Sequence, residues 1–360
     1  CGRRVRSMGM TDSEMDAHDR LTSIIGTLGN LPSTNVVLVG DIMMDRYIHG
    51  FADNLNTRAP VPVLKETRRE EAVGAAAHVA RGLVSLGFKP CLFGVVGDDT
   101  AGVSVLEYLN EEGVNTDTIS IVEGRITTVK TRLLATRQNL VRDEQLMLRW
   151  DIEADEPMPG PALDAMYDLA CEQVEGAAAV ILSDYGQGVV TDEGAARLIE
   201  RANAAGVPVI ADPKLTGFHR TQGVAWVVMQ SQGLELMRRR LGADNPAQAA
   251  HGLLEEHGWG LLLVLEGSTG VTIYGQEGED AHVDCTLTEL KQMIGLIDAA
   301  AVAITAAVAT GMDVQATALM ANAASECILG ADRTDRFVLT RDDLIERMRE
   351  TAWNLQISKR

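Results

Sequence analysis

The sequence predicts an α/β protein in which helices cover both faces of a mostly parallel sheet. Short apolar runs such as Asn35–Gly40 alternate with helical patterns along most of the chain, and several runs end directly in polar residues. Strands that alternate with helices imply right-handed crossovers between parallel neighbours. Residues 299–310 carry no charge and form a run too short to cross a membrane. We therefore expect a helix buried on all sides within a layered domain.

The composition limits the partners that the chain can have. Its 360 residues include 32 Lys and Arg against 51 Asp and Glu, which gives a net charge of −19. Such an acidic surface repels the phosphates of nucleic acids and membranes, so we expect neither as a partner. The 5 cysteines are widely spaced without a CxxC motif, a pattern typical of reduced thiols. The expected location is the cytoplasm.

The elements can be assigned in chain order. Residues 1–33 are polar and are interpreted as an N-terminal extension outside the core fold, followed by one domain over residues 34–360. Two segments, about 45–66 and 119–150, alternate apolar residues with Pro or Thr and are expected to form lid strands outside the main sheet. Strands of the main sheet are expected at 35–40, 90–97, 178–182, 207–211, 225–229 and 260–265, and helices at 101–112, 166–174, 193–205 and 340–353.

Polar or glycine residues follow successive predicted strands, at the edge where parallel sheets bind ligands. They are Asp41, Gly74, Asp184, Asp212, Lys214, Gly267, Gly270 and the segment 295–298. Together they predict a ligand crevice along one edge of the sheet. The chain has no GxxxxGKS/T motif and no GxGxxG after its first strand, which disfavours a P-loop NTPase and a dinucleotide-dependent dehydrogenase.

Asp298 has two interpretations. The start of a buried helix has unpaired backbone N–H groups and a partial positive charge, so residues 295–298 can hold an anion with Asp298 beside it. An Asp at the start of a helix is more often only an N-cap. Asp41 can likewise contact a substrate hydroxyl or only cap a turn. His78 is interpreted as a histidine on a helix face.

The order of motifs resembles the ribokinase-like pfkB family of carbohydrate kinases, and within it the heptose-7-phosphate kinases. The resemblance runs from about residue 35 to residue 344. It implies a three-layer α/β/α domain with a small β lid, a homodimer through the lid, and phosphoryl transfer from ATP to a hydroxyl of a sugar or sugar phosphate. The motifs that carry it are Gly40-Asp41 with Asp45-Arg46-Tyr47, APVPV at 59–63, Ser183-Asp184-Tyr185, Asp212-Pro213-Lys214 and Ala321-Asn322-Ala323-Ala324.

The resemblance also implies roles for individual residues. Asp298 would be the base that accepts the proton of the attacking hydroxyl, and the N–H groups from Gly295 to Asp298 would form an anion hole. The substrate would be bound by Asp41, Gly74, Ala75 and Asp184, with Arg149 and Asp151 approaching from the lid. ATP would be bound by Lys214, Gly267, Ser268, Gly270 and Asn322.

The chain departs from the family pattern at the catalytic loop and at the Mg²⁺ site. The family's Asp-x-Thr-Gly-Ala-Gly-Asp reads QMIGLID at 292–298, and its Asn-x-x-Glu reads QSQG at 230–233, with Glu235 two residues on as a substitute metal-organising acid. Its Gly-Gly-x-x-Asn reads GAAAH at 74–78. The alternative is therefore a catalytically inactive sugar- or nucleotide-binding or scaffold protein on the same fold.

Overall fold

The computed structural model describes residues 12–136, 144–154, 158–276, 278–331 and 337–357. In these ranges the main sheet has the strand order β13-β12-β11-β10-β9-β8-β1-β4-β5. Neighbours from β11 to β5 pair in parallel, whereas β12 and β13 extend the sheet antiparallel at one edge. The strands are β1 (Asn35–Gly40), β4 (Lys89–Gly97), β5 (Ile119–Val122), β8 (Val180–Ser183), β9 (Val209–Asp212), β10 (Trp226–Gln230), β11 (Leu261–Leu265), β12 (Val271–Gly275) and β13 (Ala281–Val283).

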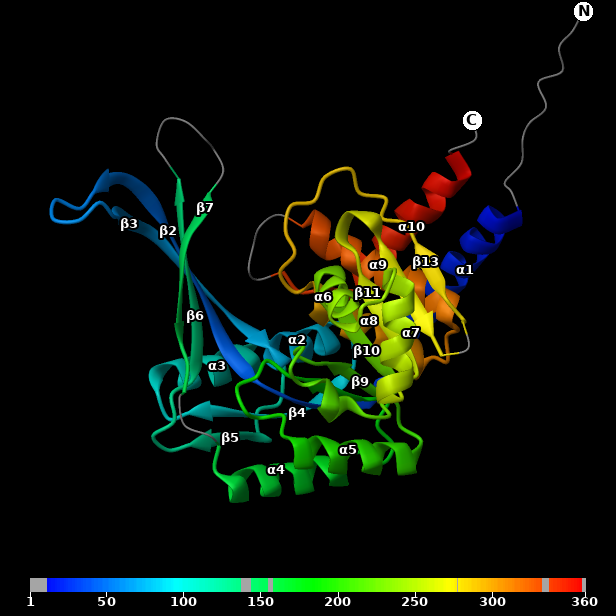
Figure 1. Cartoon of the computed structure of the whole chain (residues 1–360), viewed down its shortest axis with the longest axis horizontal. Coiled ribbons are helices and arrows are strands. Elements are labelled where there is room, and N and C mark those ends of the chain that lie inside the picture. The colour runs from blue at the N-terminus through cyan, green and yellow to red at the C-terminus, as the bar shows by residue number, and fades with distance from the viewer. Residues whose placement is uncertain (1–11, 137–143, 155–157, 277, 332–336, 358–360) are drawn as a thin grey trace, which may run out of the picture.

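Helices cover both faces of this sheet, as Figure 1 shows. Val36 and Leu38 of β1 face one hydrophobic core and Val37 and Val39 face the other, because successive side chains of a strand point to opposite faces. The first core is completed by α1 (Asp12–Leu28), α2 (Ala76–Leu86), α3 (Thr100–Glu111), α8 (Leu296–Ala309), α9 (Val314–Gly330) and α10 (Arg341–Ile357), and the second by α4 (Gly160–Glu172), α5 (Asp192–Ala205), α6 (Ser231–Leu241) and α7 (Pro246–His257). The predicted three-layer α/β/α architecture is confirmed.

The apolar run at 299–310 forms α8, which begins earlier than expected, at Leu296. Every residue from Asp298 to Ala307 is buried, as predicted for this helix. Its small side chains let it pack closely on α2, where a β-carbon on Gly82 would lie 2.9 Å from Val302. The second turn of α8 therefore packs directly on α2. No helix of the described segments is both long and apolar enough to span a membrane.

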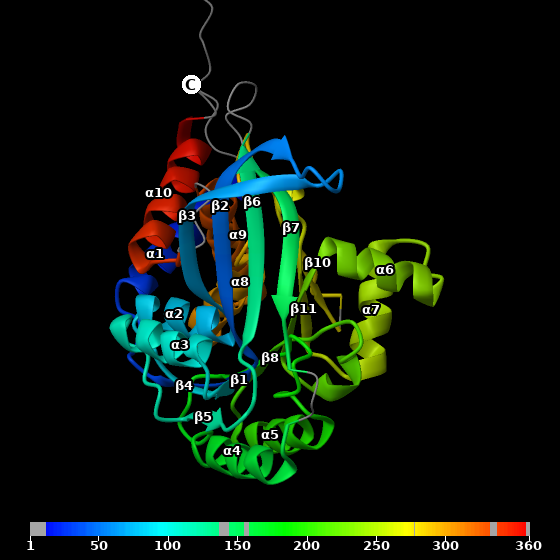
Figure 2. The same ribbon diagram turned by 90° about the vertical axis from the view of Figure 1, so that its left-hand side faces the viewer.

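A second sheet, the lid, has the order β3-β2-β6-β7 and stands away from the α/β body (Figures 1 and 2). Its strands are β2 (Ile42–Leu55), β3 (Pro62–Ala75), β6 (Thr128–Thr136) and β7 (Gln145–Ile152). The expected lid segments were misplaced at their ends. Ile119–Val122 pairs with β4 in the main sheet. The first lid segment does not end near residue 66, because β3 continues to Ala75, directly before α2. Residues 137–143 of the second predicted lid segment lie outside the described residues.

The expectation that residues 1–33 lie outside the core is wrong for α1. Leu21, Ile24 and Leu28 are spaced along one helix face and are buried in the first core. Arg20 Nη1 also donates a hydrogen bond to Asp313 Oδ2 over 2.5 Å. The helix thus packs as part of the folded body, and residues 1–11 lie outside the described residues.

Candidate active site

A pocket of about 250 Å³ lies where the lid meets the body. In Figure 2 the lid strands stand in front of the body at this place. The body contributes the junction of β3 with α2, the loops after β8 and β9, and the start of α8. The lining side chains with polar or charged groups are Asp45, Tyr47, His78, Lys130, Arg132, Arg149, Tyr185, Lys214, Gln292 and Asp298.

The register of the lid strands gathers charged side chains on the pocket face. Asp45 of β2 pairs with Lys130 of β6, Tyr47 pairs with Arg132, and Arg132 pairs in turn with Arg149 of β7. Directly paired residues share a face of the sheet. Arg132 Nη1 donates to Asp45 Oδ1 over 2.6 Å and to the hydroxyl of Tyr47 over 3.0 Å. The lid therefore presents one held carboxylate among three cations.

A fourth cation, Lys214 of the body, lies close to the lid, because its ammonium group and that of Lys130 both lie near the ring of Tyr185. The ammonium group of Lys214 lies 4.7 Å from the centre of the Tyr185 ring, and that of Lys130 lies 5.6 Å from it. Burial lowers the pKa of Lys130, and the charges of Arg149 and Lys214 lower it further. In a chain with a net charge of −19, this cluster is a local excess of positive charge that the overall composition does not indicate.

Asp298 is the third residue of α8, and Gly295 is the N-cap. Gly295 adopts a left-handed backbone, with φ of 80°, that favours glycine. The first helical bond runs from the N–H of Ala299 to the carbonyl oxygen of Gly295, so the N–H groups of 296–298 precede the helical ladder. Asp298 Oδ2 lies 2.9 Å from His78 Nδ1, and Oδ1 lies 3.4 Å from the hydroxyl of Tyr185. These contacts favour a site residue over an N-cap.

Asp41 holds the loop after β8 and does not line this pocket. Its side chain is fully buried, and its carboxylate accepts hydrogen bonds from the N–H groups of Tyr185, Gln187 and Val189 at 2.7–3.1 Å. Burial raises the pKa of Asp41 despite these bonds. Of its two interpretations, the structure supports the one in which Asp41 stabilises a turn. The predicted contact with a substrate hydroxyl has no support, because backbone groups occupy both oxygens.

Among the other predicted substrate residues, Gly74, Ala75 and Arg149 line the pocket, whereas Asp151 and Asp184 do not. Asp151 accepts two hydrogen bonds from Arg149, at 2.6 and 2.9 Å. Asp184 is buried and pairs with Arg220 over 2.9 Å. Both carboxylates are therefore engaged by arginines. They position neighbouring groups instead of facing the pocket.

Of the predicted ATP residues, Lys214 alone is among those that line the pocket. Lys214 lines the pocket, whereas Gly267, Ser268 and Gly270 belong to a turn after β11 that does not. Asn322 is 3% exposed, and its Nδ2 donates to Asp284 O and Glu326 Oε1 at 3.2 and 3.3 Å. An amide held inside the body in this way is not presented to an adenine ring.

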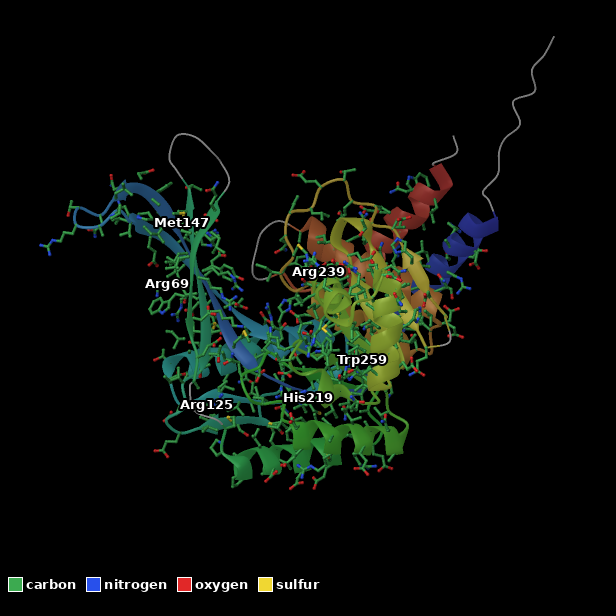
Figure 3. All side chains as sticks on the ribbon, in the orientation of Figure 1. Arg69, Arg125, Met147, His219, Arg239 and Trp259 are labelled. Atoms are coloured by element: carbon green, nitrogen blue, oxygen red, sulfur yellow. The ribbon has the colours of Figure 1, made fainter. Side chains whose placement is uncertain are left out.

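Glu235 does not fit the role of a metal-organising acid. It lies on α6, where Arg238 and Arg239 donate to both of its oxygens at 2.7–2.9 Å and lower the pKa of Glu235 to about 2. Figure 3 shows Arg239 on the body, apart from the lid strand that carries Met147. Within the described ranges, no group of three or more His, Cys, Asp or Glu residues could hold a metal ion. Glu235 is therefore engaged by two arginines and is not free to organise Mg²⁺.

Several residues that line the pocket had no predicted role in the site: Asp45, His78, Lys130, Arg132 and Tyr185. Two signals were present. Asp45 and Tyr47 are two residues apart, as are Lys130 and Arg132, and this spacing puts each pair on one face of a strand. His78 was interpreted as a helix-face residue, but its ring contacts Asp298, which is 220 positions away in the chain. No local pattern could have predicted that contact.

The fold and the pocket define a ribokinase-like α/β protein with a β lid. The chain belongs to the pfkB family of carbohydrate kinases, whose family model matches residues 33–340. The resemblance inferred from the sequence motifs is therefore confirmed. The match begins after α1, although α1 packs on the core of this chain.

Two relatives show the similarity in sequence. D-beta-D-heptose 7-phosphate kinase of Bordetella bronchiseptica is 33% identical over 296 residues, which are 82% of this chain and 90% of that protein. Bifunctional protein HldE of Paramagnetospirillum magneticum is 34% identical over 313 residues, 86% of this chain but 62% of that protein. The chain thus spans less than two thirds of the length of the bifunctional relative.

Solved structures show the same fold at lower sequence identity. Arabidopsis thaliana ribokinase complexed with ribose and ATP aligns with a TM-score of 0.68 and 18% identity, covering 88% of this chain and 99% of that one. Escherichia coli phosphofructokinase-2 in complex with fructose-6-phosphate aligns with a TM-score of 0.69 and 16% identity, covering 89% and 99%. At such identities these likenesses establish the fold alone.

Proposed function

We propose that the chain transfers the γ-phosphoryl group of ATP to a hydroxyl of a sugar phosphate of the heptose-7-phosphate type. The proposal rests on the carboxylate of Asp298, which lines the pocket beneath the lid cations and does not cap its own helix. The Bordetella bronchiseptica relative is named D-beta-D-heptose 7-phosphate kinase, which supports heptose 7-phosphate as the first substrate to test. ATP is proposed as the phosphoryl donor because the chain belongs to a carbohydrate kinase family.

In this proposal Asp298 accepts the proton of the attacking hydroxyl. The sugar oxygen forms a bond to the γ-phosphorus, and the bond from that phosphorus to the bridging oxygen of ADP breaks. The N–H groups of residues 296–298 and the positive end of the α8 dipole stabilise the negative charge on the transferring group. Catalysis of this kind depends on positioning and charge more than on covalent chemistry.

The phosphate already present on the sugar is proposed to bind the lid cations. Lys130, Arg132 and Arg149 lie on one face of the lid, and Lys214 approaches from the body. Arginine binds phosphate through a planar fork and lysine as a point charge. An unphosphorylated sugar would leave part of this charge unbalanced. The site is therefore expected to select phosphorylated sugars.

The test is phosphoryl transfer by the full chain with ATP and heptose 7-phosphate, followed by ³¹P NMR. We expect transfer in the unmodified chain and a loss of about 10²- to 10⁴-fold with Asp298→Asn, with ATP affinity nearly unchanged, because a general base acts mainly in the transition state. Equal rates for the two proteins would overturn the role of Asp298. Fructose 6-phosphate and ribose test the choice of sugar.

The second candidate is a sugar-phosphate-binding protein that no longer transfers phosphate. It is favoured by Asn322, which is buried away from the pocket, and by Glu235, which is paired with two arginines. Unfolding experiments separate the two candidates, since a ligand at 100 times its Kd stabilises the folded state by about 2.7 kcal/mol. Stabilisation by heptose 7-phosphate but not by ATP would favour the binding protein.

We also propose that the chain forms a homodimer through the outer face of the lid. Leu146, Leu148 and Trp150 alternate along β7 and are 57%, 56% and 56% exposed. Leu148 and Trp150 share one face of β7, and two large exposed apolar side chains side by side favour burial against a partner. Cys91, Cys171, Cys285 and Cys327 are free thiols, which supports the proposal of a reducing compartment such as the cytoplasm.

A further inference from the structure

His78 connects three parts of the chain at the base of the pocket. It is the third residue of α2, and its side chain is 13% exposed. Its Nδ1 lies 2.9 Å from Asp298 Oδ2 in the first turn of α8, and its Nε2 lies 3.1 Å from the carbonyl oxygen of Phe337, which precedes α10. The ring also packs on Gly295, where a β-carbon would lie 2.8 Å from His78 Cε1.

The partners of the ring determine its protonation state. A neutral imidazole has one N–H donor and one acceptor nitrogen. Both partners of His78 are acceptors, a carboxylate and a carbonyl oxygen, so both ring nitrogens must carry a proton to make both bonds. The geometry therefore selects the imidazolium form.

The charges around the ring agree with this form. Burial lowers the pKa of His78, but the hydrogen bond and charge of Asp298 outweigh burial, so the pKa is raised from its ordinary value of 6.5. Arg81 on α2 opposes the positive charge, although Glu112 pairs with that arginine. Lys214 and Tyr185 also line the pocket, from the loops after β9 and β8.

We propose that His78 is a positioning residue that holds Asp298 as an ion pair through Oδ2, so that Oδ1, whose contact with the Tyr185 hydroxyl is a longer 3.4 Å, acts on the substrate hydroxyl. This rests on the function proposed above. The imidazolium fixes one carboxylate oxygen and balances the negative charge of Asp298 where a triphosphate must approach. The family pattern has Asn at this position, and an amide can orient a carboxylate but cannot balance its charge.

The first test reads the protonation of the ring without requiring turnover. The full chain labelled with ¹⁵N-histidine is titrated by NMR, with His78→Asn to assign the signal. We expect most of the His78 rings to carry a proton on both nitrogens at pH 6.5, the ordinary imidazole pKa, and Asp298→Asn to lower the pKa of His78. His251→Asn is the control and should leave the His78 signal unchanged, because His251 forms a separate, exposed pair with Asp280 over 3.2 Å. A His78 ring with mostly a single proton at pH 6.5 in the unmodified chain would overturn the ion pair, whether or not Asp298→Asn folds.

The second test separates positioning from binding. We expect His78→Asn to lower kcat by about 10²-fold, the scale of a misplaced catalytic group, and to leave the KM for ATP nearly unchanged. The rate of the unmodified chain should fall as pH rises through the His78 pKa, and the variant should lack this fall. Unchanged kcat with His78→Asn would overturn the positioning role. If the unmodified chain transfers no phosphate while its ring is doubly protonated, the proposed function fails and the ion pair stands.

Discussion

Gly74 lies against the carboxylate of Asp45 so closely that residue 74 has no room for a β-carbon. The two residues are brought together because β3 pairs with β2, with Gly74 opposite Met43 and Asp45 two residues further along. The same carboxylate accepts a hydrogen bond from Arg132 over 2.6 Å. A single glycine thus allows the pocket to keep both its lid carboxylate and the arginine paired with it.

Gly74→Ala is expected to displace Asp45 and raise the KM for the sugar phosphate. Loss of a hydrogen bond to a charged group costs about 1.5–3 kcal/mol, which corresponds to roughly 10- to 100-fold. Steady-state kinetics at saturating ATP measure the effect. Gly252→Ala on α7 is the control, since nothing lies within 4 Å of its added β-carbon. An unchanged KM in Gly74→Ala would show that Asp45 does not contact the sugar.

Lys130→Met is expected to weaken binding of phosphorylated sugars by roughly 10-fold or more, because it removes a charged phosphate donor from a mostly buried position. Binding of the matching unphosphorylated sugar should change less. Calorimetry with both sugars measures the difference. Lys65→Met removes an exposed lysine from β3 of the same lid, outside the pocket, and serves as the control. Equal losses for both sugars would contradict phosphate binding at Lys130.

The fold could be predicted because its signals are local. The runs at 35–40 and 299–310 carry no charge and are mostly apolar, and residues 36–40 and 299–307 are buried. The ends of elements were less predictable. Ile119–Val122 has the composition of a lid strand, and only its pairing with β4 places it in the main sheet.

The site was harder to predict because the roles of its carboxylates depend on distant partners. Asp41 and Asp45 are four residues apart in similar surroundings in the sequence. The carboxylate of Asp41 accepts hydrogen bonds from backbone N–H groups of residues 185–189, whereas Asp45 lies on the pocket face of the lid. Asp298 and His78 meet across 220 residues. Motif resemblance found the carboxylate but gave no information on the residue that holds it.

Trp150→Glu is expected to convert the proposed dimer into monomers, because it places a charge in the apolar row on β7. Light scattering at micromolar concentration should then give the monomer mass of 38.7 kDa. Leu169→Glu makes a matched change at an apolar residue that is 51% exposed on α4, away from the lid, and should leave the mass unchanged. A monomer mass for the unmodified chain would rule out the lid interface.

Ala75→Gly is expected to stabilise the protein. Ala75 has φ of 56° and ψ of −133°, a backbone conformation that favours glycine and costs other residues about 1–3 kcal/mol. Glycine also makes the unfolded chain more flexible, which offsets about 0.4–1 kcal/mol of the stability gained by relieving this strain. We expect a net gain of about 1 kcal/mol in the free energy of unfolding, measured in urea. Ala77→Gly, at the second residue of α2, should instead destabilise by about 1 kcal/mol. A loss at both positions would mean that Ala75 is unstrained.

Asp212→Asn is expected to change how stability depends on pH. Burial and the charge of Asp298 raise the pKa of Asp212 from 3.8 to about 8. Between these pH values the folded protein holds a proton that the unfolded chain has released, so the free energy of unfolding falls as pH rises through this range. Asparagine stays neutral, and the variant should lack this fall.

Urea unfolding from pH 5 to pH 9 measures the difference between the two proteins. At pH 5 the variant should already be somewhat more stable, because the unfolded form of the unmodified chain has released the Asp212 proton there while the folded form still holds it. The variant should become progressively more stable than the unmodified chain as pH rises, and the difference should level off above about pH 8. Asp164→Asn, at an exposed position of α4, should show no such trend. Parallel curves for Asp212→Asn and the unmodified chain would show that Asp212 is ionised in the folded state, with Lys214 compensating its charge.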